Sequence, residues 1–358
     1  MKRTLLVLST MLLAVPPSEA NQRFTLRHHV LNANSDIIYT HPKINKQNTS
    51  QIFLSDEENI YTRTLVRAPS AWKITEGSED IIVAVIDSGI EISHPDLKNN
   101  LWTNEKEKSG KTGIDDDGNG FIDDIHGWDF VRNRPASVDG TGHGTHCAGN
   151  IAATRNGFGV VGVAPKVKIM SVRFLDSNGS GKSENAIRAM EYAVQNGAHI
   201  LSNSWGGSRY DEAMEAAVKE VHDAGVIFVA SANNNGRNID NSPSYPASYF
   251  GAIAIGSSDE SDSRSSFSNF GKKTVFIFAP GSESYSTYTN GSYEFLSGTS
   301  MAAPQVAGAF ALAKSINKNL NTNQIKQSMC AGAKKILTSV SQCGRLNLES
   351  FLQKITKI

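Results

Sequence analysis

The sequence predicts an α/β fold, a three-layer α/β/α sandwich with a mostly parallel central sheet. Two observations predict it: short apolar, β-branched runs recur along the chain, and helical patterns separate several of them. The clearest run, residues 81–86 (IIVAVI), is apolar throughout, as expected of a strand buried on both faces. Strands that alternate with helices favour a parallel sheet covered on both sides.

The remaining elements follow in chain order. Further strands are expected at residues 167–174, 199–201, 226–230 and 252–255. Helical patterns lie at residues 143–154, 183–195 and 211–224, the last ended by Gly225. The apolar run 306–313 indicates a buried helix near the carboxyl end of the chain.

The length of the chain and its charge indicate the number of domains and the kinds of partner to expect. The chain has 358 residues, and its 35 Lys and Arg balance its 35 Asp and Glu. The length suits two average domains or one large α/β domain. The balanced charge gives no reason to expect a nucleic-acid or membrane partner, and we expect a monomer.

The first twenty residues differ from the rest of the chain. Lys2 and Arg3 precede the apolar stretch 5–15, and residues 18–20 (SEA) form a small-x-small cleavage site. This pattern predicts a signal peptide at 1–20, too short for a transmembrane helix. We therefore expect a secreted protein, extracellular or periplasmic, in which disulfides can form.

Three cysteines are present. Cys330 and Cys343 lie close in sequence across a polar segment and are the expected disulfide pair. Cys147 is then left over among small and apolar residues, which is typical of a buried, inert thiol. A reactive or paired thiol is the alternative.

Three polar residues are candidates for chemistry. Asp87 directly follows the strand 81–86, His143 lies among glycines at the start of a helix, and Ser300 precedes the apolar run 306–313. Each has a simpler interpretation alone, as a turn residue, a structural histidine or a helix cap. A zinc site at His143 and His146 is not favoured, since the spacing is not HExxH. Together, the first three can supply the orienting carboxylate, base and nucleophile of acyl transfer.

The order Asp, His, Ser along the chain is the order found in subtilisin. The chain resembles the subtilisin-like serine proteases, or subtilases, in residues 83–90, 140–149 and 297–304, with weaker similarity across 61–350. The resemblance implies a subtilisin-like catalytic domain at 61–358. It also implies a serine endopeptidase that hydrolyses peptide bonds of polypeptide substrates through an acyl-enzyme.

The resemblance assigns further site residues. In the segment 230–236 (ASANNNG), Asn234 aligns with the family's oxyanion donor, and Asn233 stands where the family has glycine. The Ser300 N–H would be the second donor. Substrate-binding residues implied by the resemblance are Ser204, Trp205, Gly206, Ala232 and Asn233. Tyr245-Pro246 resembles a family segment that carries a cis peptide bond.

One or two structural calcium sites are expected. In residues 115–124 (DDDGNGFIDD), oxygen ligands occupy EF-hand-like positions, which suits Ca²⁺. The candidate ligands are Asp115, Asp117, Asn119, Phe121, Asp123 and Asp124, with Asp124 replacing the missing terminal Glu. A solvated acidic turn is the alternative. The family resemblance implies a second site with the side chains of Asp96 and Asn156 and the backbone oxygens of Thr154, Phe158 and Val160.

The N-terminal segment 21–60 is expected to be a short extension or a truncated propeptide. Residues 37–42 resemble only the tail end of the family's inhibitory prodomain, so no complete inhibitory domain is expected. Two other functions are considered. A sedolisin-type carboxyl protease would need Glu where His143 stands, and a catalytically silent binding protein would be expected to lack catalytic residues.

Overall fold

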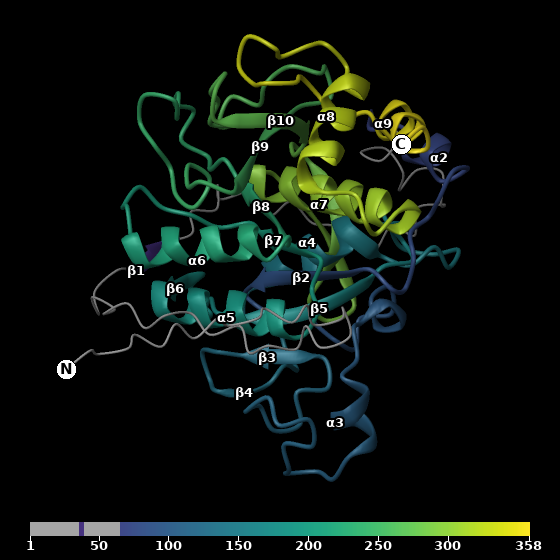
Figure 1. The fold of residues 1–358 in the computed structure, drawn as a ribbon, viewed down its shortest axis with the longest axis vertical. Coiled ribbons are helices and arrows are strands. Elements are labelled where there is room, and N and C mark those ends of the chain that lie inside the picture. Colours follow the sequence, from purple (N-terminus) through teal and green to yellow (C-terminus); the bar gives the residue numbers. More distant parts are fainter. Residues whose placement is uncertain (1–35, 39–64) are drawn as a thin grey trace, which may run out of the picture.

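The computed structural model describes residues 36–38 and 65–358 (Figure 1). The predicted signal peptide lies outside the described residues, as does the predicted extension 21–60 apart from residues 36–38. Of the prodomain-like residues 37–42, only 37 and 38 are described.

An eight-stranded sheet forms the centre of the molecule, in the order β10-β9-β8-β7-β2-β5-β3-β4. Its strands are β2 (Ile82–Asp87), β3 (Gly127–Asp129), β4 (Arg134–Pro135), β5 (Lys168–Arg173), β7 (Ile200–Asn203), β8 (Ile227–Ser231), β9 (Ala252–Ser258) and β10 (Val275–Pro280). Every neighbouring pair is parallel except β3 and β4. The prediction of a mostly parallel sheet is confirmed.

Helices cover both faces of this sheet (Figure 1). The principal helices are α4 (His143–Ala152), α5 (Ser183–Gln195), α6 (Glu212–Asp223) and α7 (Thr299–Ile316). Helices α4 and α7 pack on one face, and α5 and α6 on the other. The three-layer prediction is therefore confirmed. Within the described residues, we find no helix with the length and apolar character needed to cross a bilayer.

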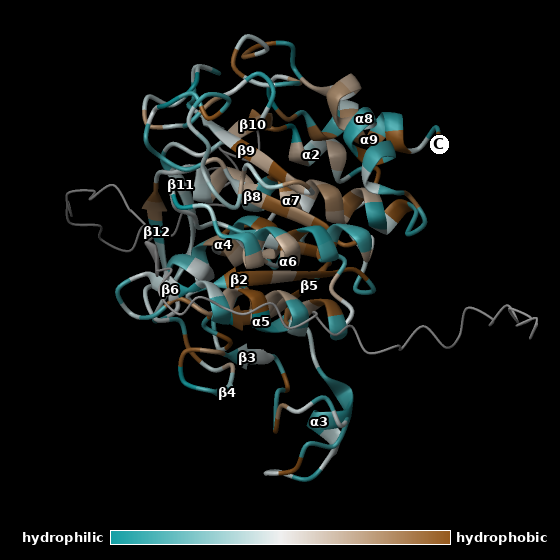
Figure 2. Ribbon diagram, turned by 60° about the vertical axis from the view of Figure 1, so that its left-hand side comes forward, coloured by the Kyte–Doolittle hydropathy of each residue, from teal (hydrophilic) through white to brown (hydrophobic). Residues whose placement is uncertain are grey.

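Strand β2 shows why helices must pack on both faces of the sheet. Val83 and Val85 belong to the core beneath α4 and α7, whereas Ala84 and Ile86 belong to the core beneath α5 and α6. Successive side chains of a strand point to opposite faces, so a strand buried on both faces must be apolar throughout. Figure 2 shows this as hydrophobic strands between helices whose outer surfaces are more hydrophilic.

Smaller elements surround the sandwich. They are β1 (Asp36–Ile38), α2 (Ala68–Ala71), a 3₁₀ turn (Lys98–Asn100), α3 (Glu105–Ser109), β6 (Ser180–Lys182), β11 (Ser284–Tyr288), β12 (Ser292–Leu296), α8 (Thr322–Gly332) and α9 (Leu348–Ile355). Strand β1 pairs antiparallel with β6, and β11 with β12. The loop that contains α3 extends below β3 and β4 in Figure 1.

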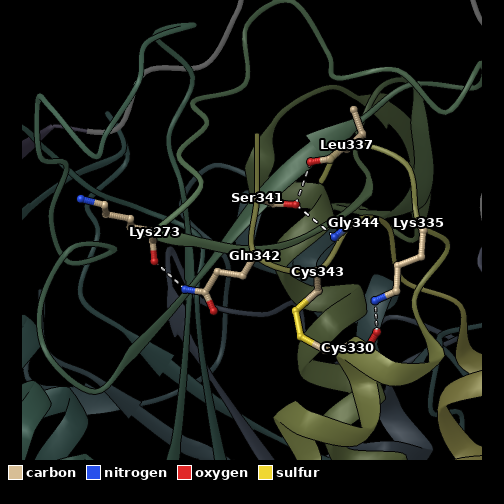
Figure 3. Close-up of a disulfide and its surroundings, with 8 residues drawn as sticks. All are labelled: Lys273, Cys330, Lys335, Leu337, Ser341, Gln342, Cys343 and Gly344. Atoms are coloured by element: carbon tan, nitrogen blue, oxygen red, sulfur yellow. Dashed lines mark hydrogen bonds between the residues drawn. A yellow bond between two sulfur atoms is a disulfide. The ribbon is translucent and has the colours of Figure 1, made fainter. Parts of the chain in front are cut away.

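The cysteines behave as predicted. Cys330 of α8 forms a disulfide with Cys343 across 13 positions of sequence (Figure 3). Around it, Lys335 donates to the Cys330 carbonyl at 2.6 Å, and Ser341 joins Leu337 and Gly344 by hydrogen bonds. Cys147 is a free thiol buried in α4.

Candidate active site

A carboxylate and an imidazole meet at the carboxyl end of β2. Asp87 is the last residue of β2, and His143 is the first residue of α4. The distance between Asp87 Oδ1 and His143 Nδ1 is 2.7 Å, and the two residues are 0% and 2% exposed. The same Oδ1 accepts the Ser88 backbone N–H at 2.7 Å. This contact leaves His143 Nε2 on the far side of the ring, where a base must face its nucleophile.

A glycine allows this approach. A Cβ on Gly144 would lie 2.1 Å from the Gly89 carbonyl oxygen and 3.2 Å from Asp87 Cβ. Only a residue without a side chain lets the first turn of α4 lie this close to the end of β2. Gly144 is therefore required for the packing of α4 against the end of β2, in addition to its place in the motif that carries His143.

A partly buried polar network connects the end of β2 to α4, and it was not predicted from the sequence. Ser88 Oγ donates to Asp139 Oδ1 at 2.7 Å and accepts the Gly144 N–H at 3.0 Å. Asp139 Oδ2 accepts both the N–H and the hydroxyl of Thr145, at 2.8 and 2.7 Å. The segment before His143 is thus fastened both to the end of β2 and to α4.

Ser300 is the second residue of α7, at the end of that helix where backbone N–H groups and the positive dipole converge. Its Oγ donates to the Ser204 carbonyl at 3.0 Å, and Ser204 Oγ donates in return to the Ser300 carbonyl at 2.9 Å. Pro304 has no N–H for the Ser300 carbonyl four residues earlier. The proline therefore leaves that carbonyl available to Ser204.

Cys147 connects the serine to the histidine. Its Sγ lies 3.4 Å from the Ser300 carbonyl oxygen and 4.0 Å from both ring nitrogens of His143. The sulfur is thus equidistant from the two ring nitrogens. Complete burial raises the pKa of this thiol, so it stays protonated and serves as a packing group and weak donor.

Asn234 lies against the start of α7. Its Oδ1 accepts two hydrogen bonds from Thr299, one from the backbone N–H and one from the hydroxyl, both at 2.9 Å. A Cβ built on Gly298 would lie 3.4 Å from Asn234 Nδ2. Thr299 thereby fixes the amide so that Nδ2 is presented on the side of the Gly298–Ser300 turn. The role of Thr299 in positioning the Asn234 amide was not predicted from the sequence.

The predicted substrate-binding residues surround Ser300 in different ways. Ser204, Trp205 and Gly206 directly follow β7. The Trp205 indole is buried and donates to the Ile86 carbonyl at 2.9 Å, so its backbone is the part left for a substrate. The backbone of Ala232 is already paired, with the Ile255 carbonyl and the Asn269 amide. Ala232 can therefore contribute a wall but no hydrogen bond.

Strand β6, which forms a small two-stranded sheet with β1, was not predicted from the sequence. Ile37 and Ile38 of β1 pair with Gly181 and Ser180 in antiparallel register. An extended segment of the chain itself thus lies on this edge as an added strand. The glycine-containing run 179–181 was a signal that could have identified it.

The predicted calcium loop gathers oxygen atoms around α3. Carboxylate oxygens of Glu107, Asp115 and Asp117 lie within 4.8 Å of one another. Asn119 Nδ2 bridges Asp117 Oδ2 at 3.1 Å and Asp124 Oδ2 at 3.0 Å. Glu107 is buried and absent from the sequence prediction, because it lies on a separate short helix outside the motif.

The other predicted loop residues have distinct places. Asp123 Oδ2 accepts the Gly113 N–H at 2.8 Å, and the Asp123 N–H donates to Glu107 Oε2 at 2.8 Å. The Phe121 ring packs edge-on against Trp128 and Tyr192, which anchors the loop on the sandwich. Burial raises the pKa of Asp124, although the Tyr192 hydroxyl donates to its Oδ2 at 2.6 Å.

The residues of the second predicted metal site meet at Asp96. Asp96 Oδ1 accepts from Asn156 Nδ2 at 2.8 Å, and Oδ2 accepts from the Val160 N–H at 2.9 Å. The Asp96 carbonyl accepts from Thr154, through both its N–H and its hydroxyl. Phe158 lies in the same loop with an exposed ring, and its N–H donates to Asn156 Oδ1 at 3.2 Å.

Tyr293 of β12 also contacts this site. Its hydroxyl donates to Asp96 Oδ2 at 2.9 Å, and burial raises the pKa of the Asp96 carboxyl. No motif in the sequence connects these two residues, which lie on elements far apart in the chain.

Comparison with known proteins agrees with this geometry. The model of the subtilase family matches residues 78–345. Thermitase from Thermoactinomyces vulgaris is 42% identical over 248 residues, which cover 69% of this chain and 79% of thermitase. A thermostable alkaline protease from Halalkalibacterium halodurans is 40% identical over 245 residues, covering 68% of this chain and 60% of that protein. Subtilisin DY from Bacillus licheniformis is 36% identical over 276 residues, 76% of this chain and 91% of subtilisin DY.

The family match spans the strand that carries Asp87, the helix that begins at His143 and the turn that carries Ser300. The predicted cis peptide bond between Tyr245 and Pro246 is also present. The chain belongs to the subtilase family.

Proposed function

We propose that this chain is a serine endopeptidase that hydrolyses polypeptides through an Asp87-His143-Ser300 triad. The observation that carries the proposal is the buried 2.7 Å contact between Asp87 Oδ1 and His143 Nδ1, beside the N-terminus of the helix that bears Ser300. Such a contact holds the imidazole in the tautomer whose Nε2 can accept a proton. Family membership supports the same chemistry.

The residues act in two half-reactions. Ser300 Oγ attacks the peptide carbonyl carbon while His143 Nε2 takes the hydroxyl proton, and His143 then delivers that proton to the leaving amine. Water, deprotonated by His143, next attacks the acyl-enzyme, and the ester bond to Ser300 Oγ breaks. His143 returns the proton to Ser300 Oγ as the acid product leaves. Asp87 stabilises the imidazolium in both steps. The Ser300 N–H and Asn234 Nδ2 donate to the oxyanion.

The substrate is expected to bind as an added strand. Antiparallel pairing of β1 with β6 supports β6 as one edge that accepts an extended peptide. The backbone of Ser204 to Gly206 would be the other edge, because it directly adjoins Ser300. Main-chain pairing gives affinity that depends little on sequence, which suits a protease acting on unfolded polypeptides.

Calcium is proposed as a structural cofactor at the acidic loop. The donor set of Glu107, Asp115 and Asp117, with Asn119 beside them, consists of oxygen atoms, which Ca²⁺ prefers. Three carboxylates this close repel one another without a cation. Bound calcium would neutralise them and hold the loop against α5.

The second site has weaker support. Asp96 is the only carboxylate among its predicted ligands, and a calcium ion there would compete with the Tyr293 hydroxyl for Asp96 Oδ2. We therefore place calcium first at the acidic loop. The secreted location and monomeric state are proposals that rest on the N-terminal sequence pattern and the balanced charge.

The test is Ser300→Ala. It should abolish casein hydrolysis and labelling by a fluorophosphonate probe, while the circular dichroism spectrum and melting temperature remain those of a folded protein. Labelling of another residue in this variant would overturn the triad. Wild-type protein that binds peptide but neither cleaves nor labels would instead be the catalytically silent binding protein. A sedolisin-type mechanism is disfavoured by the histidine that contacts Asp87.

A further inference from the structure

Asn233 has a backbone conformation that favours glycine. Its φ is 72°, in the left-handed region, where asparagine is tolerated better than most residues. The backbone there is held by its neighbours, since the Asn233 carbonyl accepts the Asn269 N–H at 2.9 Å. The side chain is held as well, because Nδ2 donates to Ser244 Oγ at 2.6 Å. Asn233 therefore has one fixed position.

The Asn233 amide lies against Gly206, in the segment that accepts a hydrogen bond from Ser300. A Cβ built on Gly206 would lie 2.5 Å from Asn233 Nδ2 and 2.8 Å from Asn233 Oδ1. The amide thus covers Gly206, two residues after the Ser204 carbonyl that accepts from Ser300 Oγ. The next residue, Gly207, exchanges two backbone hydrogen bonds of 2.8 Å with Tyr245. The Asn233 side chain therefore lies between Gly206 and Ser244.

In the proposed mechanism, the substrate side chain nearest the scissile bond would enter next to the Asn233 amide. The reacting carbonyl carbon would lie at Ser300 Oγ, and its oxygen would point toward Asn234. The substrate chain before that carbonyl would run along Ser204 to Gly206. The side chain of the same residue can then project between the segments 204–206 and 232–234.

We propose that Asn233 fills this pocket and restricts cleavage to bonds that follow small residues, such as alanine, serine and glycine. The inference rests on the proposed endopeptidase function and adds its specificity. A large aromatic side chain could enter only if the Asn233 amide left Ser244 and Gly206. That movement gives up a hydrogen bond in a partly buried site and disturbs a fixed conformation.

The experiment compares two peptide p-nitroanilides that differ only in the residue before the scissile bond, alanine or phenylalanine. Wild-type enzyme should have the higher kcat/KM for the alanine substrate. Asn233→Gly suits a φ of 72° and removes the amide, so it should raise the phenylalanine-to-alanine ratio of kcat/KM at least about tenfold. Ser244→Ala, which releases the amide without removing it, should move the ratio less and in the same direction.

Asn133→Gly is the matched control. Asn133 is an exposed asparagine with a φ of 51° in the connection between β3 and β4, so the chemical change and backbone class are the same. It should leave the ratio unchanged. A wild-type preference for phenylalanine, or equal ratios in Asn233→Gly and Asn133→Gly, would overturn the inference.

The two proposals fail in distinguishable ways. Fluorophosphonate labelling of Ser300 in the wild-type enzyme tests the endopeptidase function, whatever the substrate preference. Absence of labelling and of any peptide hydrolysis would reject that function. Labelled, active enzyme that cleaves after aromatic residues would reject the role of Asn233 alone.

Discussion

Replacing Asn234 with alanine should lower kcat far more than it changes KM. The side chain would donate one of two hydrogen bonds to the oxyanion, which is present in the transition state but not in the bound substrate. Losing one such donor costs about 10²- to 10³-fold in kcat, or about 2.7–4 kcal/mol, a magnitude that comes from the relative subtilisin. We expect a loss of that size here, because Thr299 already fixes the amide through two hydrogen bonds of 2.9 Å.

Thr299 provides a graded version of the same test. Thr299→Ala removes the hydroxyl bond to Asn234 Oδ1 but keeps the backbone bond. A neutral hydrogen bond contributes about 1 kcal/mol, so kcat should fall by about fivefold. Thr299→Ser retains the hydroxyl and should stay close to wild type.

The assay is steady-state hydrolysis of a peptide with alanine before the scissile bond, with active-site titration to count folded enzyme. The reasoning is refuted if Asn234→Ala keeps more than about a tenth of wild-type kcat. It is also refuted if Thr299→Ala loses as much as Asn234→Ala, because positioning would then matter as much as the donor itself.

The remaining predictions concern calcium binding, the disulfide and the buried thiol, and are best measured in a Ser300→Ala background that cannot digest itself. Chelation with EDTA should lower the melting temperature, and Glu107→Gln should weaken calcium binding at least about tenfold in calorimetry. Because burial raises the pKa of Asp124, protons compete with calcium at this carboxyl at a higher pH than at an ordinary one. Calcium affinity should therefore fall as the pH is lowered, and a flat affinity would contradict this. Replacing Cys330 and Cys343 with serine should cost about 3 kcal/mol in urea unfolding, since the bond closes a short loop, and an unchanged midpoint would be the contrary result. Native Cys147 should resist iodoacetamide at pH 8, since burial raises its pKa, and should react once urea unfolds the chain; modification of folded protein detected by mass spectrometry would reject its inertness.

Much of the three-layer fold was predictable because a strand that is buried on both faces has a continuous run of apolar residues. The run 81–86 became β2, Ile82–Asp87, and the helical pattern 183–195 became α5 with the same bounds. The hairpin β11–β12 was missed, although Asn290-Gly291 at its turn is a strong hairpin signal. Its strands are rich in Ser and Tyr, so their periodicity gives little contrast between core and surface.

The site was predictable only as far as local motifs extend. Asp87, His143 and Ser300 each lie in a short segment whose residue types indicate the chemistry. Glu107 and Tyr293 join their sites through contacts distant in sequence, and neither belongs to a motif. Such residues are identified by the packing of whole elements, which pattern and propensity do not specify.

The adjacent asparagines show how one backbone feature separates two functions. The left-handed conformation at Asn233 directs its amide to Ser244, while the next side chain, Asn234, lies against Thr299. Glycine at position 233 would keep this geometry and empty the pocket, so the oxyanion donor should be unaffected. Alanine there would oppose a φ of 72° and shift Asn234 as well. We therefore expect that a substitution of Asn233 can change specificity without lowering kcat only if the new residue accepts the left-handed backbone.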